Sequence, residues 1–304
     1  MSEHRRIEAI LRLGAVPGYG PARTRLMMEQ LAATESALEY LPEYEIVDLL
    51  ELGLDASQAA AFLDYEPNDL ADRLLDAGIH LVTMLDANAP RKLLSGPISP
   101  WFFVYGDVSA LGNESIGFSG SRDASPEAIE ATMQIAAAAV DRGWTVISGG
   151  ARGIDTAAHQ GALDRGGATA ILLPQGILGW RSAEMPGDGE LVIMSEFQPL
   201  DGWSSYRAMQ RNKSIVHLSD RLVIPQAGVK GGTMNAAEYA LKANHPTWVI
   251  DLGPEYEGNR LIARKGARIL PWANDPTDLD MLVTAEDILR FGQQSLELPL
   301  PEST

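Results

Sequence analysis

Ile116-Gly-Phe-Ser-Gly-Ser-Arg122 and Trp144-Thr-Val-Ile-Ser-Gly-Gly-Ala-Arg-Gly-Ile-Asp155 are the two stretches of this sequence that decide its fold. Each contains a short apolar run that leads into Ser and Gly. The Ala-rich segment 126–142 between them predicts a helix, because Pro126 stands at its first turn and Gly143 follows its end. The order strand, loop, helix, strand, loop predicts an α/β domain built on a parallel sheet.

The loops that follow the two apolar runs predict a phosphate site. Glycines let backbone N–H groups approach an anion, and the helix after each loop adds its positive end. In an open α/β sheet the ligand binds outside the carboxyl ends of the strands. Ordinary tight turns are the alternative, and the repeated chemistry favours the site. Its expected members are Ser119, Gly120, Ser121 and Arg122 in the first loop and Ser148, Gly149, Gly150 and Arg152 in the second.

The composition indicates a soluble globular protein. A chain of 304 residues is expected to form one large or two modest domains, and its 45% apolar content is ample for a packed core. No run of eighteen apolar residues predicts a membrane span, and the start of the chain lacks an apolar signal core. Because the chain has no cysteine, disulfides and thiolate metal sites are excluded. We expect a cytoplasmic protein without a metal or cofactor.

The net charge of −17 opposes broad, non-specific binding of nucleic acid. It leaves room for a local basic groove, because many cations lie between residues 122 and 268 of the chain. These are Arg122, Arg152, Arg207, Arg211, Lys213, Lys230, Arg260, Arg264, Lys265 and Arg268.

The first 75 residues predict a small all-helical domain of the helix-hairpin-helix or SAM-like kind. The apolar periodicity and the helix breakers predict helices near 5–13, 26–31, 46–52, 56–62 and 67–77. The Pro- and Gly-rich segment 16–23 separates the first two helices. Such a turn can hold a DNA phosphate on backbone amides, and a plain corner between two helices is the alternative.

The remaining apolar runs predict further strands and helices of the α/β domain. Strands are expected near 79–83, 168–173, 191–194, 222–224 and 247–251, the last taken as the final inner strand, with helices near 156–165, 235–243 and 284–291. Gly231, Gly232 and Thr233 open the second of these helices and predict another anion site.

Several of these motifs closely resemble the DNA-processing protein A (DprA/Smf) family. The resemblance rests on residues 120–122, on 148–155 with His159 and Gly161 following, and on 258–267. It implies a Rossmann-like, doubly wound domain over 76–290, with a lead-in at 76–111, the helical domain before it and a disordered tail at 291–304. It also implies binding of single-stranded DNA without catalysis, RecA loading during natural transformation, and a homodimer.

The sequence departs from the family at one motif. Where the family carries Phe-Pro-x-Arg-Asn-Arg, this chain keeps Arg211 and Asn212 but has Ala208 for Phe and Lys213 for the last Arg. Lysine keeps the charge without the bidentate fork, and the missing Phe removes a surface on which a base could stack. Tyr206 and Trp203 are the candidates to replace it. The resemblance adds Arg211, Asn212, Lys213 and Asn259 to the expected site.

Two other functions remain open from the residues. Relatives known as lysine-decarboxylase-like or "Lonely Guy" proteins carry Gly-Gly-x-Gly-Thr-x-x-Glu and hydrolyse nucleoside monophosphates. Here Ala236 stands where that Glu would be, and Glu238 falls on another helix face, so no hydrolysis is expected. The alternatives to DNA binding are a sensor or hydrolase of nucleotide derivatives that uses the same pocket, and a protein-interaction module without a ligand.

Overall fold

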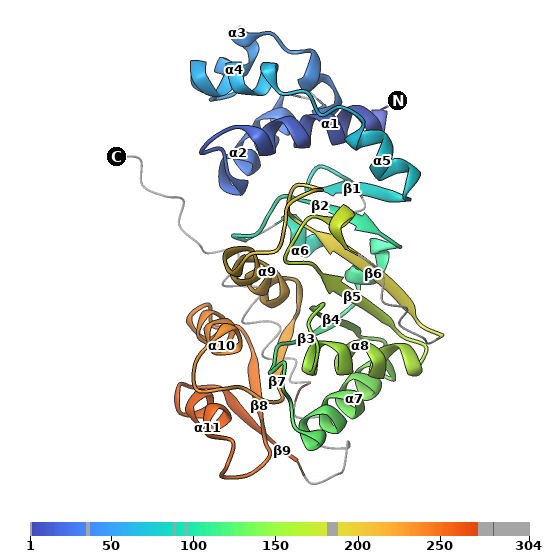
Figure 1. Cartoon of the computed structure of the whole chain (residues 1–304), viewed down its shortest axis with the longest axis vertical. Helices are drawn as coiled ribbons and strands as arrows, with labels where there is room; N and C mark the ends of the chain where they lie inside the picture. Colours follow the sequence, from blue (N-terminus) through green and yellow to red (C-terminus); the bar gives the residue numbers. More distant parts are fainter. Residues whose placement is uncertain are drawn as a thin grey trace. The chain divides into compact units, whose positions relative to one another are not determined.

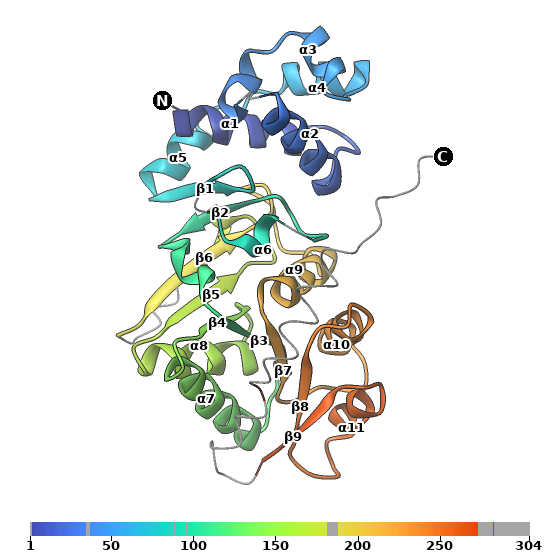
Figure 2. The same ribbon diagram turned by 180° about the vertical axis from the view of Figure 1, so that it is seen from behind.

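A computed structural model describes residues 2–34, 37–87, 89–94, 96–180, 188–272 and 282 of the chain (Figure 1, and from behind in Figure 2). The chain forms two compact units. The first comprises Met1–Val108, Gln175–Arg181 and Ile193–Trp203, and the second comprises Ser109–Pro174, Ser182–Val192 and Ser204–Thr304. The domain boundaries expected at residues 75 and 290 stay predictions.

The first unit begins with short helices, as the N-terminal sequence predicts. They are α1 (Ser2–Ala15), α2 (Pro21–Ala33), η1 (Leu38–Glu43), α3 (Ile46–Glu51), α4 (Ala56–Asp64) and α5 (Leu70–Asp76). In α1 the side chains of Ile7, Ile10 and Leu11 are fully buried, so the apolar stripe faces the core of the unit. Strands β1 (Ile79–Thr83) and β2 (Trp101–Tyr105), with α6 (Arg91–Leu94) between them, complete this part of the chain.

The rest of the chain alternates strands and helices. The elements are η2 (Val108–Gly112), β3 (Ser115–Phe118), α7 (Pro126–Val140), β4 (Thr145–Gly149), α8 (Ile154–Asp164), β5 (Ala168–Leu172), η3 (Ile177–Gly179), β6 (Glu190–Ser195), α9 (Ser205–Leu218), β7 (Arg221–Ile224), α10 (Gly232–Lys242), β8 (Thr247–Asp251), α11 (Glu257–Arg264) and β9 (Arg268–Pro271).

The strands form one nine-stranded sheet in the order β1-β2-β6-β5-β4-β3-β7-β8-β9. Adjacent strands pair in parallel through the series β5, β4, β3, β7, β8 and β9. Strand β2 runs antiparallel to both of its neighbours, β1 and β6. Strands β3 to β5 are added in one direction and β7 to β9 in the other, so the chain reverses between β3 and β7. This is the predicted doubly wound α/β fold, and it is confirmed.

Helices of the second unit cover both faces of its strands. Helices α7 and α8 lie on one face, and α9, α10 and α11 lie on the other (Figures 1 and 2). Right-handed crossovers require this arrangement when strand order reverses. The two helices of the first face pack closely because Gly161 of α8 lies against the backbone of Met133, where a Cβ atom would come within 2.8 Å of the Met133 Cα.

Three elements of this domain were not predicted from the sequence. Helices α9 and α11 fall where no helix was assigned. Strand β9 pairs with β8 at the edge of the sheet, so 247–251 is the last inner strand, as expected, and the edge strand beyond it was missed. Strand β9 has only four residues, ends in Pro271 and exposes Ile269, which makes it an edge strand without a continuous apolar run. The helix expected at 284–291 and the tail at 291–304 lie outside the described residues.

Candidate functional site

The loops after β3 and β4 lie in backbone contact, at the carboxyl ends of adjacent strands. The N–H of Ile154 donates to the carbonyl of Ser121 at 3.2 Å. Gly153, the N-cap of α8, has a φ of 81°, and a Cβ atom there would overlap Ser121 O and lie 2.8 Å from Arg122 O. Only glycine allows this approach. The two predicted phosphate loops are thus brought together at the point where strand order reverses.

Two buried ionisable side chains, Arg211 and Asp155, pack against the second loop. Arg211 of α9 is only 5% exposed, and its guanidinium donates to the carbonyl of Leu172 at the end of β5, at 2.7 Å. The guanidinium occupies the space where a side chain on Gly149 would lie, and Asp155 Oδ2 would be 2.6 Å from that Cβ atom. Burial raises the pKa of the Asp155 carboxyl, and Arg211 opposes this rise. Arg211 therefore packs against Gly149 and stabilises the conformation of the second loop.

Further hydrogen bonds hold the second loop to the strands. The N–H of Ala151 donates to the Asp155 carboxylate at 3.2 Å, and the Ser148 hydroxyl donates to the carbonyl of Phe118 at 2.9 Å. His159 lies 2.8 Å from the carbonyl of Gly149 through Nε2, which must be the donor. Burial lowers the pKa of His159 to about 4, so its imidazole is neutral at pH 7. Its other ring nitrogen, Nδ1, lies 2.7 Å from the Thr169 hydroxyl, so both nitrogens have partners in the core, and the expectation that His159 has no catalytic role stays a prediction.

The third glycine turn lies at the start of α10. Asn212 of α9 connects this turn to the buried Arg211. Asn212 accepts from Arg211 Nε at 3.1 Å and donates to the carbonyl of Gly232 at 3.4 Å. Gly231 is the N-cap, with a φ of 111°, and both glycines are exposed. The first N–H groups of a helix have no partner within the helix, so this turn points unpaired donors at solvent. Lys213 lies 5.8 Å from the ring centre of Tyr239.

The expected site residues divide into an exposed set and a buried set. The exposed residues are Arg122, Gly150, Arg152, Gly231 and Gly232, with Gly120, Ser121, Asn212, Lys213 and Thr233 partly exposed. The buried residues are Ser119, Ser148, Gly149, Arg211 and Asn259. The exposed Arg152 pairs with Asp123 at 2.7 Å, and both side chains are more than 70% exposed. Such a pair contributes little stability, and an incoming anion can replace it.

Asn259 lies in the core rather than on the surface of the site. Its side-chain oxygen accepts from the N–H of Ala227 at 2.8 Å, and its amide group donates to the carbonyls of Pro225 and Ile250 at 2.8 and 2.9 Å. Two of these bonds fix the loop after β7 to the start of α11, and the third fixes β8 to it. Its part in ligand binding stays a prediction.

The sequence did not identify an exposed apolar ridge on α9. Tyr206 is 65% exposed and Met209 is 43% exposed. With Lys213 they occupy positions i, i+3 and i+7, which share one helix face. Met209 and Asn235 of α10 are neighbours, with 3.8 Å between Sδ and Nδ2. The helical spacing would have revealed the ridge if α9 had been recognised as a helix.

Among the residues that the structure describes, no group of three or more His, Asp or Glu side chains could hold a metal ion. No helix within the described ranges is long and apolar enough to cross a membrane.

Comparison with known proteins gives the family. The model of the DNA recombination-mediator protein A family matches residues 80–279, and that of the SMF/DprA SAM domain matches 4–75. The chain is 28% identical over 283 residues to protein Smf of Escherichia coli, covering 85% of this chain and 74% of that protein. It is 24% identical over 182 residues to DNA processing protein DprA of Streptococcus pneumoniae, covering 57% of this chain and 64% of that protein.

Two solved structures share the fold. The DprA structure from Streptococcus pneumoniae superposes with a TM-score of 0.74 at 18% identity, covering 91% of this chain and 98% of that one. DNA processing protein A from Helicobacter pylori, described for its single-stranded DNA binding mode, gives a TM-score of 0.56 at 24% identity and covers 66% and 95%. The chain therefore belongs to the DNA recombination-mediator protein A (DprA/Smf) family.

Proposed function

We propose that this chain is a non-catalytic DNA-processing protein that binds single-stranded DNA along the glycine loops of its second unit. The observation that carries the proposal is the junction of the two loops at the switch point, where Ile154 bonds to Ser121 and Arg152 and Arg122 are exposed. Backbone N–H groups and arginines are the donors that phosphate oxygens require. The Helicobacter pylori relative, described as binding single-stranded DNA, supports this ligand.

The roles within the site follow from burial. Arg122, Arg152 and Lys213 contact phosphates, because their side chains reach solvent. Arg211 supports the surface without contacting the DNA, because its guanidinium bonds to the Leu172 carbonyl and packs against Gly149. The exposed backbone N–H groups of the turn before α10 extend the site along the DNA strand.

Base contacts fall to the ridge on α9. Ala208 cannot stack on a base, whereas Tyr206 presents an exposed ring two residues earlier. Aromatic rings provide a stacking surface for every base, so this contact is indifferent to sequence. A single strand, whose bases are accessible, therefore binds more tightly than a duplex.

The charge of −17 limits the long-range attraction of DNA. Binding then depends on short-range contacts at the loops. The wider role that we propose is that of the family resemblance: loading of RecA on the bound strand, as in natural transformation, by a cytoplasmic homodimer.

The test is the salt dependence of strand binding, measured by fluorescence anisotropy with a labelled oligonucleotide. Arg122→Ala, Arg152→Ala and Lys213→Ala should each weaken binding and reduce the slope of log affinity against log salt by about 0.7 for a single strand. Arg165→Ala is the matched control, because Arg165 is exposed and pairs with Asp141 beyond the opposite end of α8. Unchanged slopes in all three variants, with the fold intact by circular dichroism, would reject the proposal.

A further inference from the structure

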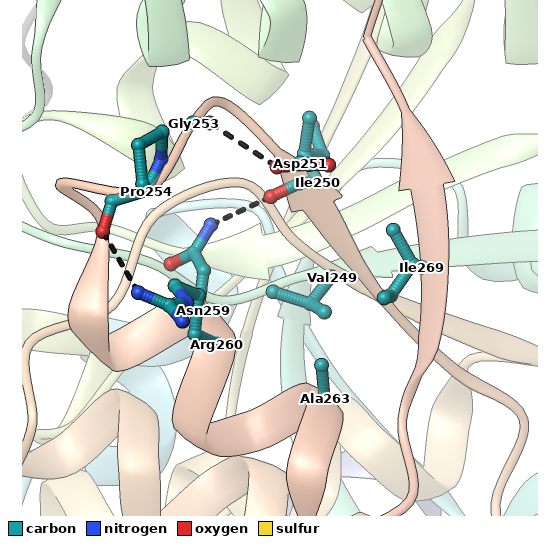
Figure 3. Close-up of a pocket in the computed structure, with 9 residues that line it drawn as sticks. All are labelled: Val249, Ile250, Asp251, Gly253, Pro254, Asn259, Arg260, Ala263 and Ile269. Atoms are coloured by element: carbon teal, nitrogen blue, oxygen red, sulfur yellow. Dashed lines mark hydrogen bonds between the residues drawn. The ribbon is translucent and has the colours of Figure 1, made fainter.

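A second candidate site is a cavity at the end of β8, and among its lining residues only Asn259 was expected at the first site. Its volume is about 360 Å³, and the end of β8, the following loop, α11 and β9 line it (Figure 3). This volume lies within the range of small-molecule sites. The carboxyl ends of strands are also where open α/β sheets bind ligands.

The floor of the cavity is apolar. Val249 and Ile269 are direct partners in the parallel register of β8 and β9, so their side chains lie on the same face of the sheet. Ala263 of α11 faces them across the cavity. Ile269 is 52% exposed although it is a large apolar side chain. A planar, apolar ligand would cover it.

The rim carries one carboxylate and one guanidinium from two different elements. Asp251 ends β8 and accepts from the N–H of Gly253 at 3.2 Å. Arg260 lies on α11 and donates to the carbonyl of Pro254 at 3.4 Å. Each thus bonds to the loop backbone, and neither forms an ion pair with another side chain in the described part of the chain. Both retain the capacity to bind a ligand.

The cavity wall is held in place before any ligand arrives. Asn259, next to Arg260, bonds to three backbone groups, one of them the carbonyl of Ile250 in β8. Asp251 and Arg260 tie down the loop between them. Pre-organisation of this kind reduces the entropy lost on binding.

The cations near the cavity lie toward the C-terminal part of α11 and β9. Residues 251–257 contain three acidic residues, whereas residues 258–272 contain four cations and no acidic residue, in a chain whose net charge is −17. Arg264 follows Arg260 by one helical turn and is exposed. Lys265 pairs with Glu238, and Arg268 lies over Trp248 on the other face of the sheet. An anionic group is therefore favoured at Arg260 and Arg264.

We propose that this cavity binds a nucleotide. The phosphate binds Arg260, the base lies on Ile269, and the donor edge of the base bonds to Asp251. A carboxylate accepts two parallel hydrogen bonds from adjacent donors, and guanine offers its ring N–H beside its amino group. Uracil and thymine present one N–H between two carbonyls, which a carboxylate repels. The site thus favours guanine and disfavours uracil and thymine.

The proposal does not depend on strand binding at the glycine loops, and it can be tested separately. Isothermal titration calorimetry with guanosine, adenosine, cytidine and uridine monophosphates should give the tightest binding for guanosine and the weakest for uridine. Asp251→Asn and Arg260→Ala should each weaken guanosine monophosphate roughly tenfold to a hundredfold, the range for loss of a hydrogen bond to a charged group. Ala263→Leu should also weaken it by filling the cavity.

Two controls separate this site from the strand site. Arg122→Ala should leave nucleotide binding unchanged, and Asp251→Asn should leave the salt slope for a long strand unchanged. A 5′-phosphorylated oligonucleotide that begins with guanosine separates the two sources of the ligand: if it binds better than the free nucleotide and loses this advantage in Asp251→Asn, the site takes strand ends. No binding of any nucleotide, or equal binding by the wild type and all three variants, would overturn the proposal.

Discussion

The loop after β4 and the loop before α10 both contain a Gly-Gly pair, and the structure uses them differently. In the first, Gly149 lies against Arg211 and Asp155, so a methyl group has no room. In the second, nothing lies within 4 Å of a Cβ atom on Gly231, and the nearest atom to one on Gly232 is Asn212 Nδ2 at 3.8 Å. At the first pair, packing requires Gly149, whereas a Cβ atom on the exposed Gly150 would lie 3.4 Å from its nearest neighbour, an ordinary contact. At the second, Gly231 is required by its positive φ alone.

This difference separates residues that stabilise a loop from residues that are free to contact a ligand. The packed loop keeps its shape through buried charges and hydrogen bonds, which a ligand need not provide. The open turn presents its donors to solvent. Substitutions in the packed loop should therefore reduce stability first, and substitutions at the open residues should reduce binding first.

The largest effect is expected for Arg211→Ala. Its loss leaves the buried Asp155 carboxylate without its cation, which costs about 3–5 kcal/mol in the free energy of unfolding. Lys213→Ala, on the same helix but partly exposed, should cost below about 1 kcal/mol. Denaturant unfolding followed by circular dichroism measures both. Arg211→Ala combined with Asp155→Asn should recover part of the loss, and equal stabilities for the two single variants would contradict the distinction.

Acid should destabilise the packed loop through His159. Its pKa in the folded chain is about 4, against 6.5 unfolded, so the unfolded chain binds more protons between these values. The free energy of unfolding should be highest above pH 6.5 and fall by about 3 kcal/mol from this residue as the pH drops to 4. His245 has the same lowered pKa and adds a similar share. In His159→Gln the His159 share of the pH dependence should disappear; an unchanged dependence would exclude His159.

Alanine at the two glycine pairs tests the comparison itself. Gly149→Ala should lower the free energy of unfolding by about 1–3 kcal/mol, because the methyl group displaces the buried guanidinium. Gly232→Ala should be neutral or stabilise by up to about 1 kcal/mol, since alanine favours the helix. Thermal unfolding of the two variants under the same conditions compares their stabilities. Equal destabilisation would mean that both loops are packed.

An effect similar in size to that of Gly149→Ala is expected on DNA binding, at the α9 ridge. Tyr206→Ala should lower strand affinity by about 1–3 kcal/mol, the loss for one stacked base, while Tyr206→Phe keeps most of it. Tyr40 in the first unit is also exposed, at 52%, and Tyr40→Ala serves as the control. The measurement is anisotropy with a labelled strand. Equal affinities for the Tyr206 and Tyr40 alanine variants would remove the ridge from the site.

The sequence predicted the parts of this fold in which an apolar run meets glycine. Strands β3 and β4 and their loops are of this kind, because each signal is local. Helix α9 was missed because its apolar pattern is inverted: Tyr206 and Met209 face solvent while Arg211 is buried. The burial of Arg211 could not be predicted, because its partner Asp155 belongs to a different strand–helix unit that only the folded sheet brings near.

Strand length tests the central claim most directly. Anisotropy at fixed salt should compare oligothymidylates of increasing length, using the Asp251→Asn chain so that the second cavity contributes little. A strand needs several donors in line, so the affinity should climb steeply from a mononucleotide to oligomers of roughly 4–16 nucleotides. An affinity that is the same for a mononucleotide and for every oligomer would contradict single-strand binding along the glycine loops.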